Sequence, residues 1–262
     1  MLRLNGRQGD DWMIVQRDLY KGIPVLHIYN EKMNEHTPIV IFLHGFMSAK
    51  EHNLHYAYNF VEKGVRVIMP DAYLHGERDE DLPEVQMSLM FWQIVMTSIG
   101  EVGALKAELE SRGYIGKVAV AGTSMGGVTT TGCLSKYKWI ETASILMGTV
   151  SFPQFLKIQF DDLERKGVEL PLTPAQIEEV NSLLEPYDGY AFDTLLTQIP
   201  VYMWHGAKDT TVPIRLTEPF MAYLEEKNIA HRITYVKDPR AGHAVSRKGI
   251  LACTEFIAQH LA

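Results

Sequence analysis

Short apolar runs alternate along this chain with longer segments that have helical periodicity. The runs are a few residues long and rich in β-branched and small side chains, which is typical of strands buried on both faces of a sheet. Strands alternating with helices in this way predict an α/β fold with a mostly parallel central sheet and helices on both faces. We expect the strands at residues 38–43, 65–69, 118–121, 143–147, 201–204 and 232–236.

Apolar positions three and four residues apart mark most of the segments between these strands. Gly100 and Gly103 are weak points of the longest such segment, because glycine is a poor helix former. The first predicted helix joins two predicted strands, and strand–helix–strand is the crossover unit of parallel sheets. We expect helices at about residues 50–63, 84–112, 128–137, 214–227 and 246–259.

Residues 12–29 have a different pattern, in which apolar and polar positions alternate around Lys21-Gly22-Ile23-Pro24. Period-two alternation interrupted by a glycine and a proline predicts two antiparallel strands joined by a turn. We therefore expect this pair of strands at the edge of the sheet.

A long excursion separates two of the predicted core strands. Residues 151–197 contain amphipathic helical patterns at 152–166, 174–185 and 190–196, broken by three prolines and Gly189. Connections of this length are uncommon and typical of a cap, or lid, over a site. We expect a single domain over residues 1–262, with residues 151–197 as a helical cap inserted between core strands.

Composition narrows the classes of function. With 262 residues, of which 46% are hydrophobic, the chain can bury a large core. A formal charge of −7 without any basic block argues against nucleic acid or an anionic membrane surface as a partner. Cys133 and Cys253 are too few for a disulfide framework, and the first residues lack the apolar segment of a signal peptide. These features predict a soluble, cytoplasmic protein that acts on a small molecule.

The most informative motif is Gly122-Thr-Ser124-Met-Gly126, which follows a predicted buried strand and precedes a predicted helix. A sharp strand-to-helix turn strains the serine backbone and exposes its hydroxyl, while the glycines let strand and helix approach closely. The first amides of the helix would then face an oxyanion formed beside the serine. The alternative interpretation is a tight glycine-rich turn without chemistry.

Candidate partners for Ser124 follow in the order that a catalytic triad on a parallel sheet requires. Asp209 comes after one core strand, and His243 lies in a loop after the next. His243 would take the serine proton, and Asp209 would hold its other ring nitrogen. Taken singly, Asp209 could be a helix N-cap or turn residue, and His243 a surface loop residue. Their shared position at the carboxyl ends of strands, where ligands bind in such sheets, favours the triad.

An oxyanion hole requires a second backbone donor beside the amide of Met125. The loop His44-Gly45-Phe46 after the first parallel strand offers one, most simply the amide of Phe46. His44 itself could order this loop by hydrogen bonding. We therefore predict an oxyanion hole formed by the amides of Phe46 and Met125.

The neighbouring strand is followed by Asp71, His75 and Arg78. Together with His44, these side chains are candidates for a substrate pocket, although for Asp71, His75 and Arg78 a salt-bridged turn is the favoured interpretation. Glu51, His52 and His55 share a helical face without a recognisable metal-binding spacing, and the sequence contains no phosphate or dinucleotide fingerprint. We therefore predict neither a metal nor an organic cofactor.

The motifs resemble those of the α/β-hydrolase superfamily, and within it the small bacterial esterases related to the prolyl oligopeptidase catalytic domain and to dienelactone hydrolases. The resemblance implies the α/β-hydrolase fold, with Ser124, Asp209 and His243 as nucleophile, acid and base. Two departures are the lack of an N-terminal propeller domain and a serine where dienelactone hydrolases use cysteine. The resemblance extends from about Pro38 to the end and rests on His44-Gly45-Phe46, Pro70-Asp71, His75-Gly76-Glu77-Arg78, Gly122–Gly127, His205–Pro213 and Gly242-His243.

The sequence as a whole predicts a serine carboxylesterase that cleaves small to medium acyl esters through an acyl-enzyme. The alternatives are a peptidase or acyl-peptide hydrolase of the prolyl oligopeptidase type and, less favoured, a non-catalytic binding protein on a hydrolase scaffold. Apolar positions of the cap would line an acyl pocket or pack the cap helix onto the sheet edge. These positions are Phe152, Phe155, Leu156, Ile158 and Phe160.

Overall fold

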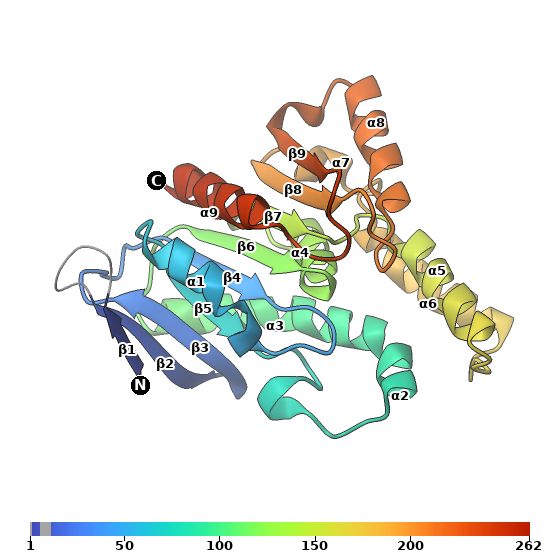
Figure 1. Cartoon of the computed structure of the whole chain (residues 1–262), viewed down its shortest axis with the longest axis horizontal. Helices are drawn as coiled ribbons and strands as arrows, with labels where there is room; N and C mark the ends of the chain where they lie inside the picture. The colour runs from blue at the N-terminus through green and yellow to red at the C-terminus, as the bar shows by residue number, and fades with distance from the viewer. Residues whose placement is uncertain (1, 6–11) are drawn as a thin grey trace.

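The computed structural model describes residues 2–5 and 12–262 (Figure 1). Within these ranges one nine-stranded sheet has the order β1-β2-β3-β5-β4-β6-β7-β8-β9. The pairs from β1 to β5 through β3 are antiparallel, and every pair from β5 through β4 to β9 is parallel. The strands are β1 (Leu2–Asn5), β2 (Trp12–Tyr20), β3 (Ile23–Asn30), β4 (Ile39–Leu43), β5 (Arg66–Pro70), β6 (Val118–Thr123), β7 (Ile140–Leu146), β8 (Val201–Gly206) and β9 (Ile233–Asp238).

Helices cover both faces of this sheet, as the alternating pattern predicts. The α-helices are α1 (Leu54–Val61), α2 (Glu84–Leu89), α3 (Phe91–Ser111), α4 (Met125–Lys136), α5 (Phe152–Arg165), α6 (Pro174–Leu184), α7 (Asp193–Leu196), α8 (Glu218–Glu226) and α9 (Arg247–Leu261). Short 3₁₀ helices occur at η1 (Lys50–Asn53), η2 (Gly76–Arg78), η3 (Glu185–Tyr187), η4 (Ile214–Leu216) and η5 (Ala230–Arg232).

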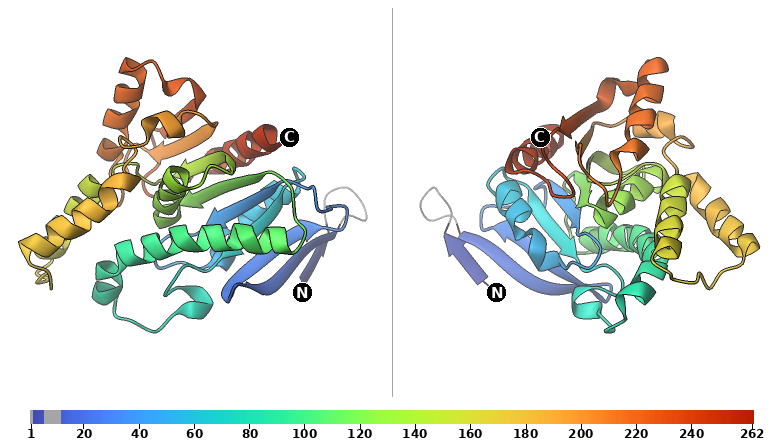
Figure 2. Two further views of the ribbon diagram at one scale, coloured as in Figure 1. Left: turned by 180° about the vertical axis from the view of Figure 1, so that it is seen from behind. Right: turned by 45° about the vertical axis from the view of Figure 1, so that its right-hand side comes forward.

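Strand β4 shows how one apolar run serves two cores. Ile39 and Ile41 belong to the core that includes residues of α3 and α4 on one face, whereas Val40 and Phe42 belong to the core that includes residues of α1 and α9 on the other. Successive side chains of a strand point to opposite faces, so a strand buried on both sides is apolar throughout. Figure 2 shows α3 lying across one face of the sheet when the molecule is seen from behind.

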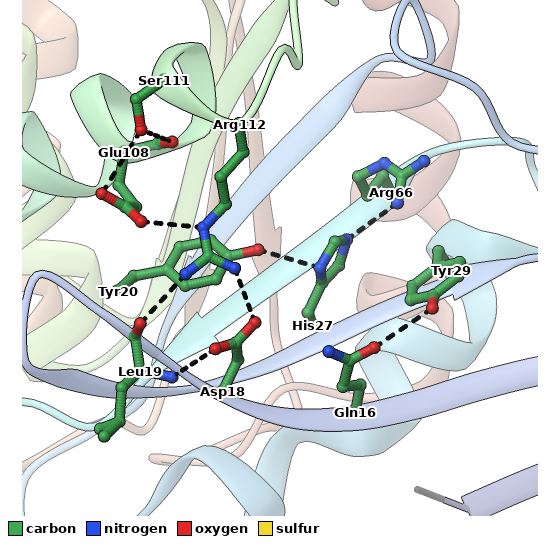
Figure 3. A network of polar contacts seen from close by, with 10 residues as sticks. All are labelled: Gln16, Asp18, Leu19, Tyr20, His27, Tyr29, Arg66, Glu108, Ser111 and Arg112. Atoms are coloured by element: carbon green, nitrogen blue, oxygen red, sulfur yellow. Dashed lines mark hydrogen bonds and ion pairs between the residues drawn. The ribbon is translucent and has the colours of Figure 1, made fainter.

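The antiparallel strands are fastened to the rest of the molecule by a polar network (Figure 3). Arg112 at the end of α3 donates to a carboxylate oxygen of Asp18 on β2 at 2.7 Å. Below it, Nε2 of the buried His27 accepts a hydrogen bond from the guanidinium of Arg66 at 2.8 Å, and Nδ1 lies 2.9 Å from the hydroxyl of Tyr20. Burial, reinforced by Arg66, lowers the pKa of His27 to about 3, so this imidazole is neutral.

Several element boundaries differ from the sequence predictions. The helix expected over residues 84–112 divides at Met90 and runs unbroken through Gly100 and Gly103. The helix expected from residue 214 begins as η4, and α8 starts afresh beside Pro219, which has no amide with which to continue the preceding turn. The pattern that predicts a helix over 190–196 yields only α7, because the amide of Tyr190 bonds to the Asp188 side chain in a turn.

Two further differences concern the start of the chain and the first crossover. Strand β1 was not predicted, and most of the first ten residues, interpreted above as lacking a signal peptide, lie outside the described ranges. The helix expected over residues 50–63 begins as η1 and becomes α1 at Leu54. The crossover itself is confirmed, because β4 and β5 on either side of it pair in parallel.

Helices α5 and α6 project from the body beyond the sheet, at the edge towards which β4 and β6 point (Figure 1). The first turns of α5 belong to the main core: Phe152 lies 5.1 Å from the ring of Trp92, and Phe155 lies 5.8 Å from that of Phe91. Leu156 is also buried, whereas Ile158 and Phe160 are half-buried. The inserted segment is therefore anchored at its base by aromatic packing against α3.

Candidate active site

Ser124 lies at a strained turn between β6 and α4. Its backbone has φ 55° and ψ −118°, a conformation that a residue with a side chain rarely adopts. A β-carbon at Gly126 would lie 2.1 Å from the carbonyl oxygen of Leu43, and one at Gly122 would lie 2.4 Å from that of Gly126. Both glycines are thus required for the close approach of strand and helix, as the motif predicts.

Three side chains from distant parts of the sequence form a continuous hydrogen-bonded series. Nε2 of His243 lies 2.8 Å from Oγ of Ser124, and Nδ1 of His243 lies 2.7 Å from Oδ2 of Asp209. An ionised carboxylate can only accept hydrogen bonds, so the ring proton belongs on Nδ1 and Nε2 is free to accept the serine proton. Ser124 follows β6, Asp209 follows β8, and His243 lies in the loop between β9 and α9.

The surroundings of Asp209 keep it ionised although its side chain is fully buried. Burial alone would raise its pKa, but hydrogen bonds from His205, His243 and the backbone amide of Val212 lower the pKa well below its ordinary value. The second carboxylate oxygen accepts the amides of Thr211 and Val212 at 2.9 and 3.0 Å. A charged acceptor fixed in this way holds the His243 ring in one tautomer.

His205 is a residue to which sequence reasoning assigned no role, although it lies within the quoted motif. The residue is 1% exposed, with Nε2 placed 2.8 Å from the carbonyl oxygen of Val212 and 3.5 Å from Oδ2 of Asp209. The signal available in the sequence was its position at the end of β8, four residues before Asp209.

The loop after β4 lies against the nucleophile. A β-carbon at Gly45 would lie 3.4 Å from Cβ of Ser124. The ring of Phe46 packs against His75 and Phe91, each at 5.6 Å between centroids. Met125 is buried at the first position of α4, directly after Ser124. The amides of Phe46 and Met125 as oxyanion donors remain a prediction.

The loop after β5 holds the remaining predicted site residues. Nε2 of His44 accepts the amide of Ala72 at 3.0 Å, and Nε2 of His75 accepts the amide of Met47 at 3.0 Å. Arg78 makes a forked ion pair with Glu101 of α3, with bonds of 2.8 and 2.7 Å. These contacts tie the loop after β5 to the loop after β4 and to α3.

Asp71 is completely buried together with Lys50, a residue that sequence reasoning missed. Nζ of Lys50 lies 2.5 Å from Asp71 and 2.7 Å from Glu77, and the backbone amide of Lys50 donates to Asp71 at 3.1 Å. The amide of Glu77 donates to the same carboxylate at 2.9 Å. Asp71 is thus saturated with intramolecular partners, while a substrate-pocket role for Asp71, His44, His75 and Arg78 stays a prediction.

An open groove of about 280 Å³ lies beside this pair of loops. Its lining includes Met47 and His75, the apolar side chains of Leu74, Leu82 and Met87, and the carboxylates of Asp79 and Asp81. The groove thus combines apolar side chains with polar and charged groups.

Neither a metal-binding cluster nor a membrane-spanning helix is found in the described part of the chain. No group of three or more His, Cys, Asp or Glu side chains in it is arranged to hold a metal ion. No helix in residues 2–5 and 12–262 combines the length and the apolar character needed to cross a bilayer. Cys133 and Cys253 are both buried and unpaired.

Comparison with known proteins agrees with the predicted fold. The model of the prolyl oligopeptidase family matches residues 102–262, which include Ser124, Asp209 and His243. Putative esterase YitV of Bacillus subtilis (strain 168) is 38% identical over 253 residues, covering 94% of this chain and 99% of that protein. Esterase YjfP of Escherichia coli (strain K12) is 30% identical over 245 residues, covering 91% of this chain and 96% of that protein.

A solved structure shows the same fold over nearly the whole length. TT1662 from Thermus thermophilus superposes with a TM-score of 0.74 at 19% sequence identity, covering 95% of this chain and 98% of that chain. The predicted α/β-hydrolase fold is confirmed by this superposition and by the strand order. The chain belongs to the prolyl oligopeptidase family and is a hydrolase with the α/β-hydrolase fold.

Proposed function

We propose that this protein is a serine carboxylesterase with Ser124 as nucleophile, His243 as general base and Asp209 as the acid that orients the histidine. The observation that carries the proposal is the unbroken series Asp209–His243–Ser124, with separations of 2.7 and 2.8 Å, at the carboxyl ends of the parallel strands. A serine hydroxyl is a poor nucleophile at neutral pH unless a neighbouring base removes its proton. The names of the two curated relatives support an ester as the substrate.

The geometry supports a double-displacement reaction. As Oγ of Ser124 attacks the ester carbonyl carbon, its proton passes to Nε2 of His243, and Asp209 stabilises the resulting imidazolium. The negative charge on the carbonyl oxygen is stabilised by the amides of Phe46 and Met125, the latter at the positive end of the α4 dipole. His243 then protonates the departing alcohol, and water, activated by the same histidine, releases the acid from Ser124.

The surroundings of the series support small to medium acyl esters. The groove of about 280 Å³ beside Met47 lies just below the usual range for sites of drug-sized ligands, about 300–1,000 Å³. The rings of Phe46, Phe91 and Phe155 follow one another at 5.6 and 5.8 Å between centroids, from the oxyanion loop to the base of α5. We assign residues 151–197 as a cap whose aromatic base is linked to Phe46 of the oxyanion loop through the ring of Phe91.

Hydrolysis of p-nitrophenyl esters from acetate to decanoate, by the wild type and by Ser124→Ala, tests the proposal. We expect the wild type to turn over short and medium esters and to react with a fluorophosphonate, and both properties to vanish in Ser124→Ala. Rapid cleavage of prolyl or acyl-peptide substrates with little ester turnover would instead support the peptidase alternative. The observation behind this alternative is the match to the prolyl oligopeptidase family. A folded wild type that neither reacts with the fluorophosphonate nor cleaves any ester would refute the enzymatic assignment.

A further inference from the structure

Two loops beside Ser124 are joined by reciprocal hydrogen bonds, in which a histidine of each loop accepts a backbone amide of the other. His44, from the loop after β4, accepts the amide of Ala72 in the loop after β5, and His75, from the loop after β5, accepts the amide of Met47 in the loop after β4. Each bond is 3.0 Å long and ends on Nε2. A backbone N–H is always the donor, so both Nε2 atoms lack a proton and both imidazoles are neutral, with their proton on Nδ1.

This tautomer has a consequence for the peptide unit that contacts the nucleophile. Nδ1 of His44 carries a proton and lies 2.8 Å from the carbonyl oxygen of Gly45, to which it donates. In a planar trans peptide the carbonyl of Gly45 and the N–H of Phe46 point in opposite directions. A bond that fixes the Gly45 carbonyl therefore also fixes the direction of the Phe46 amide.

His75 controls the next peptide unit. Its bond to the Met47 amide holds a residue with φ 54°, in the left-handed region that is unfavourable for a residue with a side chain. Its own Nδ1–H donates to the carbonyl oxygen of Tyr73 at 2.9 Å, and its ring packs against Phe46. Phe46 thus lies between two peptide units, each held by a neutral histidine.

We propose that His44 and His75 are positioning residues for the oxyanion hole, acting through the backbone amide of Phe46. The inference rests on the proposed function, because it assigns a reason for the orientation of one oxyanion donor. Hydrogen-bond donors contribute to catalysis only if they are held in place before charge develops on the substrate. The reciprocal hydrogen bonds of His44 and His75 hold the loop after β4 in that orientation from both sides.

Paired substitutions separate positioning from simple stability. His44→Leu and His75→Leu remove the bonds, whereas the amide of His44→Asn can still donate to the Gly45 carbonyl and that of His75→Gln can still accept the Met47 amide. His27→Leu, which removes an equally buried neutral histidine of the β3 network, is the matched control. The readouts are kcat and KM for a p-nitrophenyl ester, the Ki of a trifluoromethyl ketone that forms an oxyanion adduct, and the melting temperature.

We expect each leucine variant to lower kcat by roughly 10- to 10³-fold with KM changed less than about threefold, since loss of one oxyanion donor costs about 10²- to 10³-fold. The Ki of the ketone should rise in proportion to the loss of kcat/KM. His44→Asn and His75→Gln should recover about tenfold of the lost kcat. His27→Leu should lower the melting temperature and keep kcat within about twofold.

Leucine variants with wild-type kcat, or asparagine and glutamine variants no better than leucine, would overturn the proposal. Should a leucine variant fail to fold, the ¹⁵N resonances of the two imidazoles in the wild type provide a second test. We expect Nδ1 protonated and Nε2 unprotonated in both rings, and a proton on either Nε2 would contradict the geometry. A wild type without esterase activity would remove the proposed function itself, which is measured first and separately.

Discussion

Oδ2 of Asp209 lies 2.7 Å from Nδ1 of His243, while Oδ1 of the same carboxylate accepts two backbone amides of the following turn. The carboxylate therefore has one oxygen for holding its own loop in place and one for the histidine. Because hydrogen bonds keep the pKa of Asp209 well below its ordinary value, the carboxylate is ionised at neutral pH. The ring of His243 is consequently held with Nε2 towards Ser124.

Asp209→Asn should preserve the positions of the three side chains but change the tautomer of the His243 ring. An asparagine amide can donate to Nδ1, which would leave the ring proton on Nε2 and the serine without a base. We expect kcat for p-nitrophenyl butyrate to fall by roughly 10³- to 10⁴-fold with little change in KM. Steady-state kinetics check this, with melting temperature as the control for folding. A loss of less than tenfold would show that Asp209 does not set the tautomer.

Ser124→Ala and His243→Ala should each lower kcat by roughly 10³-fold or more, and the double variant should be hardly worse than either. The two side chains share one proton at 2.8 Å, so removing either partner abolishes the same step. A double-mutant cycle on kcat is the measurement. Losses that multiply across the cycle would mean that the two residues act independently.

Lys50→Met should destabilise the protein by about 3–5 kcal/mol, because it leaves the carboxylate of Asp71 buried without its cation. The double variant Lys50→Met, Asp71→Asn should lose less than the sum of the single losses, since no uncompensated charge remains. Urea unfolding gives the free energies. The control is Lys63→Met, which breaks an exposed ion pair with Glu255 and should cost less than about 1 kcal/mol. Equal losses in Lys50→Met and Lys63→Met would contradict this account.

Gly126→Ala and Gly100→Ala should have opposite effects. A β-carbon at Gly126 would collide with the carbonyl oxygen of Leu43 at 2.1 Å, so we expect loss of fluorophosphonate labelling and a lower melting temperature. Gly100 lies exposed within α3 with nothing within 4 Å of a β-carbon, and alanine there should stabilise the helix by about 0.5–1 kcal/mol. Thermal unfolding of both variants provides the comparison. A fully labelled Gly126→Ala protein would refute the close approach.

Stability should decrease as the pH falls from about 6.5 to 4. Burial lowers the pKa of His44 to about 4 and, with Arg66, that of His27 to about 3, whereas both return to about 6.5 in the unfolded chain. The unfolded chain therefore binds more protons in this window, and the free energy of unfolding falls with pH. Asp71 and Asp209 have lowered pKa values, so their protonation reduces the free energy of unfolding further only below about pH 4.

Urea midpoints measured at pH 7.5, 6.5, 5.5 and 4.5 check this pH dependence. His27→Gln should show a shallower decline than the wild type, because one of the buried neutral histidines is gone. A midpoint that stays constant between pH 7 and 5 would show that these imidazoles are not buried in the neutral form.

Local patterns in the sequence account for most of the fold. Each strand of the parallel sheet is a short apolar run, because both faces of such a strand are buried and no polar position interrupts it. The turn at Ser124 was predicted because two glycines are required wherever strand and helix backbones approach so closely. The boundaries at Met90 and Pro219 were missed, since local propensity does not locate where one helix stops and another begins.

The candidate triad could be predicted because its members keep a fixed order at the ends of successive strands, and topology alone places those ends together. The roles of the charged and histidine residues could not be predicted in this way. Lys50 and Asp71 lie 21 positions apart, and Met47 and His75 lie 28 apart. Nothing in either local pattern indicates that the first pair is buried or that the second is hydrogen-bonded.

The sequence by itself thus determined the α/β-hydrolase architecture, the order of the catalytic candidates and the strained turn at Ser124, because these depend on local sterics and on apolar periodicity. Only the tertiary structure decided which polar groups are buried, which imidazole nitrogen carries the proton, and how the loops after β4 and β5 hold each other. Those features depend on contacts between distant segments, where desolvation and hydrogen-bond geometry, rather than residue type, set the chemistry.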